Sequence, residues 1–281
     1  MHRRTTTTTQ PTRPAAPNFS ELLIDAIKRP GSVMQAYSAF YNYSVGNQLL
    51  ALFQCMFRGL QPGPIKTFPG WKDCGRNVKR GEKALMLCMP ITFKRGSAGD
   101  AESNGDLDSD ECFTTGFMYK SRWFVISQTE GPEIELPSLP QWDAATALRN
   151  LAITLTPFTE TDGNLQGYAL HNSNEIAINP VAQLPGKTLF HELGHQILLH
   201  THETMPAERT PKHLREVEAE AVALLCCEAL GLEGAEFCRG YIQGWANDEP
   251  IPEPSAKKII GAADKILRAG RPAETKTEIA H

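Results

Sequence analysis

The sequence KTLFHELGHQILLH, residues 187–200, carries two histidines four positions apart, His191 and His195, with Glu192 directly after the first. Residues four apart lie on one face of a helix, so both imidazoles can bind the same metal ion. Glu192 is then close enough to a metal-bound water to act as its general base. This spacing predicts one zinc ion per chain, and the alternative is an amphipathic helix that carries two histidines without a metal.

A catalytic zinc site usually has a third protein ligand. A histidine six residues after His195 marks one large class of such sites, but Thr201 occupies that position. His200 and His202 lie off the face that carries the first two histidines, so we expect them to cap or follow the end of the helix. The third ligand is therefore expected elsewhere in the chain.

A second helix is expected from Leu214 onward, with Gly231 as its natural stop. Glu216 and Glu220 are four residues apart on this helix and share a face, whereas Glu218 points elsewhere. Such a pair suits one carboxylate on the metal and one hydrogen-bonded to a ligand imidazole. The spacing allows either assignment, and a solvated acidic face is the alternative to both.

The stretch Glu216-x-x-Ala219-Glu220 resembles the glutamate-ligand zincins, a class of zinc peptidases in which a following helix completes the metal site. This resemblance implies that Glu216 is the third ligand and that Glu220 hydrogen-bonds a ligand histidine. The reverse assignment is the second choice, and Glu218 is the third. In such a site Glu192 is the catalytic residue.

Composition and charge favour a soluble protein with two different halves. Hydrophobic residues make up 41% of the 281 positions, and no apolar run reaches the roughly 18 residues that span a bilayer. The chain start lacks the apolar segment of a secretory signal, and seven cysteines without CxxC spacing favour a reducing compartment, so we expect a cytoplasmic protein.

The two halves of the chain differ in charge. Residues 1–130 carry 16 Lys and Arg against 11 Asp and Glu, whereas residues 131–281 carry 12 Lys and Arg against 21 Asp and Glu. This asymmetry suggests a half that binds a polyanion.

Aromatic and basic residues gather in the first half of the chain. Binding of single-stranded nucleic acid needs aromatic faces for base stacking and cations for the phosphate backbone. The residues that would supply these groups are Tyr43, Trp71, Lys72, Arg76, Lys79, Arg80 and Lys83. The equally weighted alternative places the aromatic residues in a core and the cations on an ordinary surface.

Several short motifs resemble those of ArdC-type antirestriction proteins, in the same order along the chain. They lie at 43–50, 71, 75–83, 90 and 124–131 in the first half, and at 167–168, 175–180, 191–195, 216–231 and 241–245 in the second. The resemblance implies an N-terminal domain that binds single-stranded DNA, with Asn47 among the contacts, followed by a zincin-like metallopeptidase domain. It further implies a plasmid or mobile-element protein that protects incoming conjugative DNA from restriction.

The expected architecture is α+β with two domains. A mixed α/β single-stranded-DNA-binding domain is expected over 18–132, a linker over 133–140 and a zincin-like domain over 141–269, with disordered tails at 1–17 and 270–281. Helices are expected over 20–29, 44–54, 142–155 and 256–267, and strands over 84–95 and 113–126, joined by an acidic loop at 100–111. A hairpin of 167–170 and 175–179 would offer its second strand to an extended peptide. The expected partners are single-stranded DNA and a protein or peptide substrate, with no membrane; the oligomeric state is not indicated.

Overall fold

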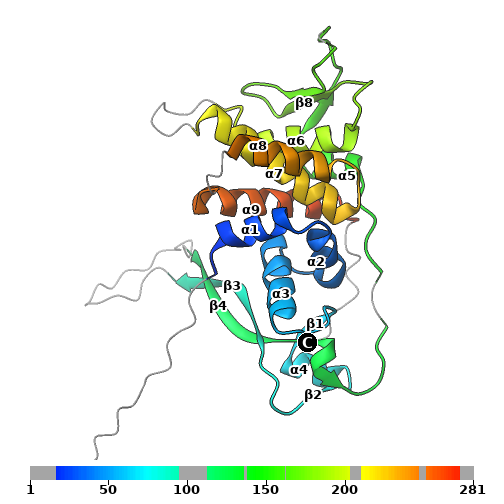
Figure 1. Ribbon diagram of the computed structural model, residues 1–281, viewed down its shortest axis with the longest axis vertical. Helices are drawn as coiled ribbons and strands as arrows, with labels where there is room; N and C mark the ends of the chain where they lie inside the picture. Colours follow the sequence, from blue (N-terminus) through cyan, green and yellow to red (C-terminus); the bar gives the residue numbers. More distant parts are fainter. Residues whose placement is uncertain are drawn as a thin grey trace, which may run out of the picture.

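The computed structural model describes residues 17–94, 113–135, 138–161, 163–202, 210–246 and 251–272 of the chain. Helices and three small sheets make up a mixed α/β fold within these ranges (Figure 1). The predicted acidic loop and nearly all of the two predicted tails lie outside the described residues.

Three helices open the described chain, and local capping sets their starts. The Asn18 side chain accepts hydrogen bonds from the backbone amides of Ser20 and Glu21, and the Ser44 hydroxyl accepts one from the Asn47 amide. Gly31, with a φ of 83°, precedes the second helix. The helices are α1 (Phe19–Lys28), α2 (Ser32–Phe40) and α3 (Val45–Phe57), which confirms the helices predicted at 20–29 and 44–54.

A long antiparallel hairpin follows and packs its inner face on α3. The two strands predicted at 84–95 and 113–126 are confirmed, and they pair from Leu85 with Trp123 to Lys94 with Phe113, with a register shift between Leu85 and Met86. The elements are β1 (Ile65–Thr67), α4 (Phe68–Asp73), β2 (Asn77–Val78), β3 (Leu85–Lys94), β4 (Phe113–Val125) and β5 (Thr129–Glu130). The strand order is β1-β4-β3, with β2 and β5 forming a separate pair.

The second half places helices on a small mixed sheet. Its elements are α5 (Ala144–Leu151), β6 (Thr154–Thr156), β7 (Gly167–Ala169), β8 (Glu175–Ile178), α6 (Pro185–Ile197), α7 (Lys212–Leu230), α8 (Ala235–Ala246) and α9 (Glu253–Ala269). The helices expected around the histidines, from Leu214 and over 256–267 are all present.

Two expectations for this half are wrong. The helix predicted to reach residue 155 ends at Leu151, because Ala152 turns with a φ of 54° and the β-branched run that follows pairs with β8 as a parallel strand. β8 itself is not an edge, since β6 and β7 pair with it on its two sides. The strand that ends the sheet on the antiparallel side is β7.

One hydrophobic core runs through both predicted domains. Leu23 and Val45 from the first half belong to the same cluster as Phe190, Ala221 and Ile260 from the second. α7 packs on α6, α8, α9 and α2, and α9 lies between α7 and α1 (Figure 1). The two-domain division remains a prediction, and the halves are joined by side-chain packing as well as by the chain.

A buried ion pair also connects the halves. One oxygen of Glu228 on α7 accepts a hydrogen bond from the backbone amide of Val33 on α2, at 3.0 Å. Its other oxygen pairs with Arg239 on α8, and both side chains are buried. Such a contact is costly to break on one side only, because the remaining charge is left in a region of low dielectric.

Replacement of Glu228 by Ala should lower the free energy of unfolding by about 3–5 kcal/mol, because it strands the buried guanidinium of Arg239. Urea denaturation at neutral pH measures this change. Glu236→Ala is the matched control, since the Glu236 side chain is 76% exposed and lies 3.7 Å from the same arginine. A surface pair contributes about 1 kcal/mol or less. Equal losses in the two variants would contradict this assignment.

Candidate metal centre and nucleic-acid interface

The candidate metal centre depends on a close crossing of α6 and α7. A Cβ atom added to Gly194 would lie 3.2 Å from the Cα of Ala219 and 3.3 Å from its carbonyl oxygen. The small residues Gly194 and Ala219 therefore let the backbones of α6 and α7 approach each other, whereas larger side chains would separate the helices. This approach places Glu216 of α7 over His191 and His195 of α6.

The three side chains converge on one point. The Nε2 atoms of His191 and His195 are 3.1 Å apart, and each lies 3.6 Å from Oε2 of Glu216. Donors bound to a tetrahedral zinc ion at about 2.0–2.1 Å lie about 3.4 Å from one another. Two imidazoles and a carboxylate thus fit zinc in type and spacing, and the same set also suits other divalent metals.

Glu220 lies behind the first histidine, on the side away from the ligand atoms. Its Oε2 is 2.8 Å from Nδ1 of His191, and its Oε1 is 2.9 Å from Nζ of Lys187. A proton on Nδ1 donated to Glu220 leaves Nε2 of His191 as the free acceptor that a metal needs. Glu220 is thus hydrogen-bonded to His191, and its supporting role for a bound metal stays a prediction.

His200 also reaches the site, contrary to the sequence expectation. Leu199 adopts a φ of 61°, and the His200 amide donates to the carbonyl of His195 at 2.9 Å, so the chain folds back over the helix end. His200 is buried, with Nδ1 3.0 Å from Nδ1 of His195 and Nε2 2.8 Å from Oε2 of Glu218. Left-handed turns are usually made by glycine or asparagine, so nothing in the sequence indicates a turn at a leucine.

This hydrogen-bonded arrangement determines which ring nitrogens of His195 and His200 carry a proton. If Nε2 of His195 holds a metal, its Nδ1 carries a proton and donates it to Nδ1 of His200. Nε2 of His200 then carries a proton and donates to Glu218, the carboxylate ranked third as a ligand. Glu218 and Glu220 therefore support different histidines from different sides. His202 follows the helix end, as expected.

Burial and neighbouring charges set the protonation of the metal-free site. Burial lowers the pKa of His191, but the nearby Glu216 carboxylate and the hydrogen bond to Glu220 outweigh it and raise this pKa to about 9. The two neighbouring histidines, each 3.6 Å from its carboxylate, hold the pKa of Glu216 far below its usual range. Burial raises the pKa of Glu192, against the opposing effect of the histidines. A carboxylate of raised pKa beside a metal site is suited to accept and return a proton.

A cavity of about 430 Å³ adjoins these residues, with His191 and Glu192 in its wall. Gly167 at the start of β7 also lines it, and a Cβ atom there would lie 2.7 Å from Thr188 and 3.3 Å from the Glu192 side chain. Glycine thus lets the sheet approach α6 directly beside the predicted base. The strand edge next to this cavity belongs to β7, and not to the 175–179 segment.

Two residues expected to contact nucleic acid are part of the interior. Trp71 is fully buried, and its indole nitrogen donates to the carbonyl of Phe124 at 2.8 Å. Arg76 is buried, and its guanidinium donates to Thr129 and to the carbonyl of Gly131. Trp71 thus joins α4 to β4, and Arg76, in the turn after α4, joins that turn to β5 and Gly131. The predictions of base stacking and phosphate contact are therefore corrected for these two side chains.

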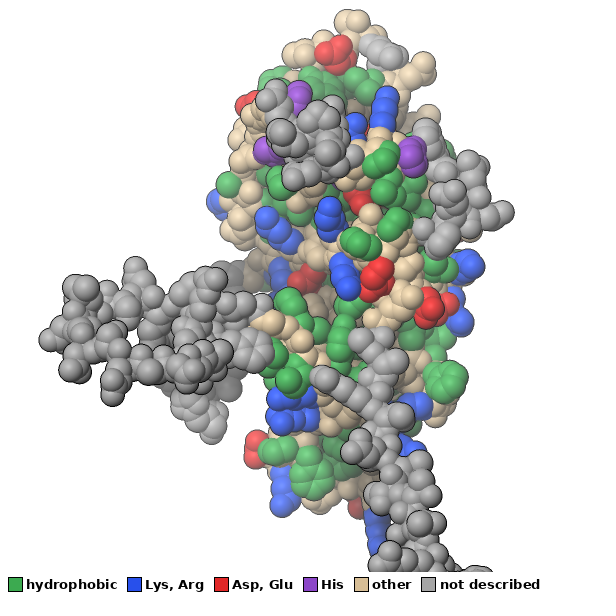
Figure 2. All heavy atoms as spheres, turned by 90° about the vertical axis from the view of Figure 1, so that its left-hand side faces the viewer, with side chains coloured by type: hydrophobic (Ala, Val, Ile, Leu, Met, Phe, Trp, Pro, Cys, Tyr) green, Lys and Arg blue, Asp and Glu red, His purple; other side chains and the backbone are tan. Residues whose placement is uncertain are grey.

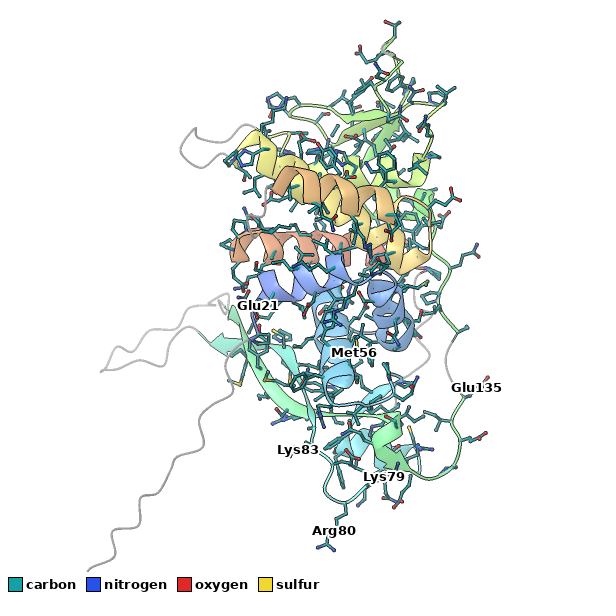
Figure 3. All side chains as sticks on the ribbon, in the orientation of Figure 1. Glu21, Met56, Lys79, Arg80, Lys83 and Glu135 are labelled. Atoms are coloured by element: carbon teal, nitrogen blue, oxygen red, sulfur yellow. The ribbon has the colours of Figure 1, made fainter. Side chains whose placement is uncertain are left out.

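The other predicted contacts divide into structural and exposed residues. Asn47 exchanges two hydrogen bonds with the backbone of Cys88, and the Tyr43 hydroxyl donates to the carbonyl of Ile65. Four cations are exposed: Lys72, Lys79, Arg80 and Lys83. Three of them lie on the loop at one end of the molecule (Figure 3), distant from α6 and α7. Figure 2 shows Lys and Arg mixed with acidic and hydrophobic side chains on the face it displays, without a continuous basic stripe.

The fold and the site define a mixed α/β protein with a candidate His–His–Glu metal centre between two helices. Residues 25–117 match the family model of the N-terminal domain of anti-restriction factor ArdC, so the predicted resemblance is confirmed over this part of the chain. The metal-free crystal structure of the antirestriction protein ArdC from plasmid R388 has a TM-score of 0.50 at 16% identity, covering 90% of this chain and 97% of that one. This likeness concerns the fold.

Two further matches cover most of this chain. The Mn(II)-bound structure of the R388 protein covers 91% of this chain and 98% of its own, with 16% identity and a TM-score of 0.48. An uncharacterized protein of Bacillus anthracis, pXO2-81, is 22% identical over 289 residues, which cover 81% of this chain. The chain spans 48% of that relative's length. Within the described residues, no helix has the length and apolar character to cross a bilayer.

The metal-free protein should show a His191 ring that titrates near pH 9. Since this value lies above the ordinary 6.5, the protonated ring stabilises the fold fully below pH 6.5, and this contribution is lost as the pH rises through 9. Ring-proton NMR over this range, with thermal unfolding in a chelator, measures both effects. Glu216→Gln should lower the His191 pKa. A ring that titrates near 6.5 in the unsubstituted protein would refute the described contacts of His191 with Glu216 and Glu220.

Glu218→Gln should weaken zinc binding about tenfold to a hundredfold, because Gln cannot accept from His200 with the same charge and the orientation of His195 relaxes. Competition with a chromophoric chelator measures the dissociation constant. Glu236→Gln, an exposed change on α8, is the control and should leave it unchanged. Unaltered zinc affinity in a folded Glu218 variant would remove the supporting role of this pair.

Proposed function

We propose that this chain is a single-stranded-DNA-binding antirestriction protein that protects incoming mobile-element DNA in the cytoplasm. The observation that carries the proposal is the match of residues 25–117 to the N-terminal domain of ArdC. The exposed cations Lys72, Lys79, Arg80 and Lys83 support it, because phosphate contacts dominate affinity for nucleic acid.

The proposed division of labour keeps DNA binding in 18–132 and a zincin-like metallopeptidase site in 141–269, connected by 133–140. The shared core implies that DNA bound to one half is held at a set position relative to the other half. If the two halves were produced as separate fragments, the apolar surfaces of α1, α2 and α9 that pack across them would be exposed. Tests are therefore best made with the full chain.

A second candidate function, peptide hydrolysis, is favoured by the convergence of His191, His195 and Glu216. A bound zinc ion would polarise a substrate carbonyl and make water more acidic. The two histidines would hold the ion through Nε2 and Glu216 through its carboxylate. Glu192 would accept the proton of the attacking water and deliver it to the leaving amine. The edge of β7 would align an extended peptide beside the cavity.

Binding to a labelled single-stranded oligonucleotide should weaken steeply between about 50 and 200 mM salt, because each phosphate contact releases counterions. Fluorescence anisotropy with the full chain measures this, with a duplex of the same sequence for comparison. Joint replacement of Lys79, Arg80 and Lys83 by Ala should reduce the slope by about 0.7 for each phosphate that the variant no longer binds. A salt-independent affinity would argue against phosphate binding altogether.

Glu192→Gln should abolish peptide hydrolysis while zinc content stays near one per chain, because the base is removed and the ligands remain. Cleavage of a peptide library, together with metal analysis, tests this. The same variant in a restriction-protection assay separates the two functions: retained protection assigns it to DNA binding, and abolished protection makes hydrolysis part of it. Unchanged cleavage by the variant would exclude Glu192 as the base.

A further inference from the structure

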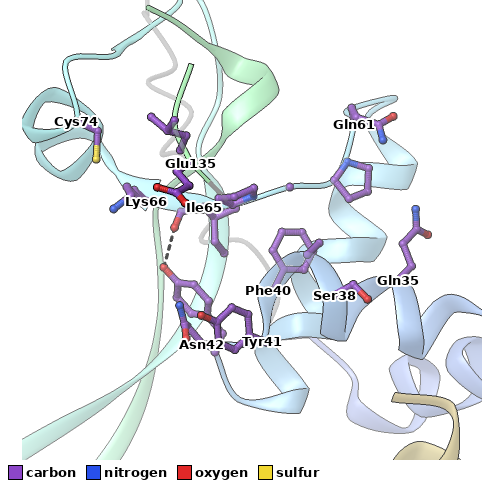
Figure 4. Close-up of a pocket in the computed structure, with 16 residues that line it drawn as sticks. Gln35, Ser38, Phe40, Tyr41, Asn42, Gln61, Ile65, Lys66, Cys74 and Glu135 are labelled. Atoms are coloured by element: carbon purple, nitrogen blue, oxygen red, sulfur yellow. Dashed lines mark hydrogen bonds between the residues drawn. The ribbon is translucent and has the colours of Figure 1, made fainter. Parts of the chain in front are cut away.

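A cavity of about 810 Å³ lies between α2, β1 and the segment after β5, away from the metal centre (Figure 4). Phe40, Tyr41 and Asn42 line one side of it, and Lys66 and Glu135 line the other. Its volume is within the range of small-molecule sites, and it combines aromatic, amide and charged groups. The exposed cations of the loop between β2 and β3 do not line it.

Tyr41 offers this cavity an aromatic ring that is held in place. The guanidinium carbon of Arg271 lies 5.8 Å from the centre of the Tyr41 ring and 5.3 Å from that of Tyr37. Nε and Nη2 of Arg271 are buried, with no hydrogen-bond partner among the described residues. The Arg271 guanidinium therefore contributes a cation–π contact that holds the Tyr41 ring in place. Because the ring is already ordered, a base that stacks on it would restrict the motion of few further side chains.

The polar groups around this ring match the edges of a nucleobase. Gln35, Asn42 and Gln61 are exposed amides that line the cavity, each able to donate and accept. Glu135 accepts only, as the exocyclic amino group of cytosine requires, while Lys66 donates to ring carbonyls or phosphate. Thymine carries a carbonyl oxygen where cytosine carries this amino group, so the carboxylate would meet an acceptor at that position of the base.

We propose that this cavity binds an unstacked nucleobase of single-stranded DNA, with Tyr41 stacking on the base and Glu135 accepting from an exocyclic amino group. The inference rests on the proposed DNA binding and adds the position and the base preference of one contact. It supplies the aromatic surface that Trp71, being buried, cannot supply.

The helix α4, which carries an exposed aromatic residue and an exposed cation, ends beside the cavity. Cys74 lines the cavity directly after α4, and Phe68 and Lys72 lie four residues apart on that helix, both exposed. An aromatic ring and a cation on one helix face are the groups that a following nucleotide needs. A strand that leaves the cavity can thus meet α4 next.

The test compares oligo-dC and oligo-dT of equal length in anisotropy titrations with the full chain. We expect tighter binding of oligo-dC. Tyr41→Ala should weaken it by about fivefold to a hundredfold, whereas Tyr41→Phe, which keeps the ring, should bind like the unsubstituted protein. Phe117→Ala removes a 73% exposed aromatic residue from β4 and is the matched control, expected to have no effect.

The Glu135→Ala variant distinguishes recognition of the base from the general effect of a negative charge on DNA affinity. Removal of one negative charge should strengthen binding of oligo-dT, yet the preference for oligo-dC should fall toward one. A preference that survives this change would overturn the role of Glu135. An increase in affinity that is equal for both oligonucleotides would overturn it as well.

A measurement on the unsubstituted protein avoids dependence on how the variants fold. An oligonucleotide with 2-aminopurine, which carries an exocyclic amino group, should change its emission on binding as the base leaves its neighbours and stacks on Tyr41. Bound DNA without such a change, or with equal affinity for the Ala and Phe variants at 41, would overturn the inference and leave DNA binding intact. No binding of any oligonucleotide by the unsubstituted protein would instead refute the proposed function.

Discussion

The contact between Gly194 of α6 and Ala219 of α7 is the constraint on which the candidate metal centre depends. Three ligand atoms from two helices can converge within 3.6 Å only if the helix axes approach closely. A side chain at 194 would push α7 outward and carry Glu216 away from the histidines. Because α7 also packs on α2, α8 and α9, the same displacement would disturb the core that joins both halves.

The charges of α7 are arranged around this contact. Glu216, Glu218 and Glu220 alternate along the helix, and each meets a different group: the ligand atoms, His200 and His191. Lys187 partly neutralises Glu220 from α6. Buried carboxylates are tolerated when they are hydrogen-bonded, and each of the two glutamates behind the site has one oxygen in such a contact, Glu218 with His200 and Glu220 with His191.

The first half follows a different rule, in which conspicuous aromatic and basic residues serve the fold. Trp71 holds α4 to β4, Arg76 holds the turn after α4 to β5, and Asn47 connects α3 to β3, all through hydrogen bonds. The groups left for a ligand are the less conspicuous ones: Tyr41 on the turn after α2 and the exposed lysines. An aromatic residue next to cations in a sequence therefore does not indicate a binding surface until its burial is known.

Elements whose evidence is local could be predicted from the order of the amino acids alone. The four-residue spacing of His191 and His195, and of Glu216 and Glu220, requires only helical periodicity, and the strands at 84–95 and 113–126 follow from their composition. Features that depend on distant partners or on unusual backbone are visible only in the folded chain. The turn at Leu199 brings His200 to the site, pairing on both sides makes β8 a central strand, and packing against β4 buries Trp71. None of these features leaves a periodic pattern in the sequence, because each depends on contacts between residues that only folding brings together.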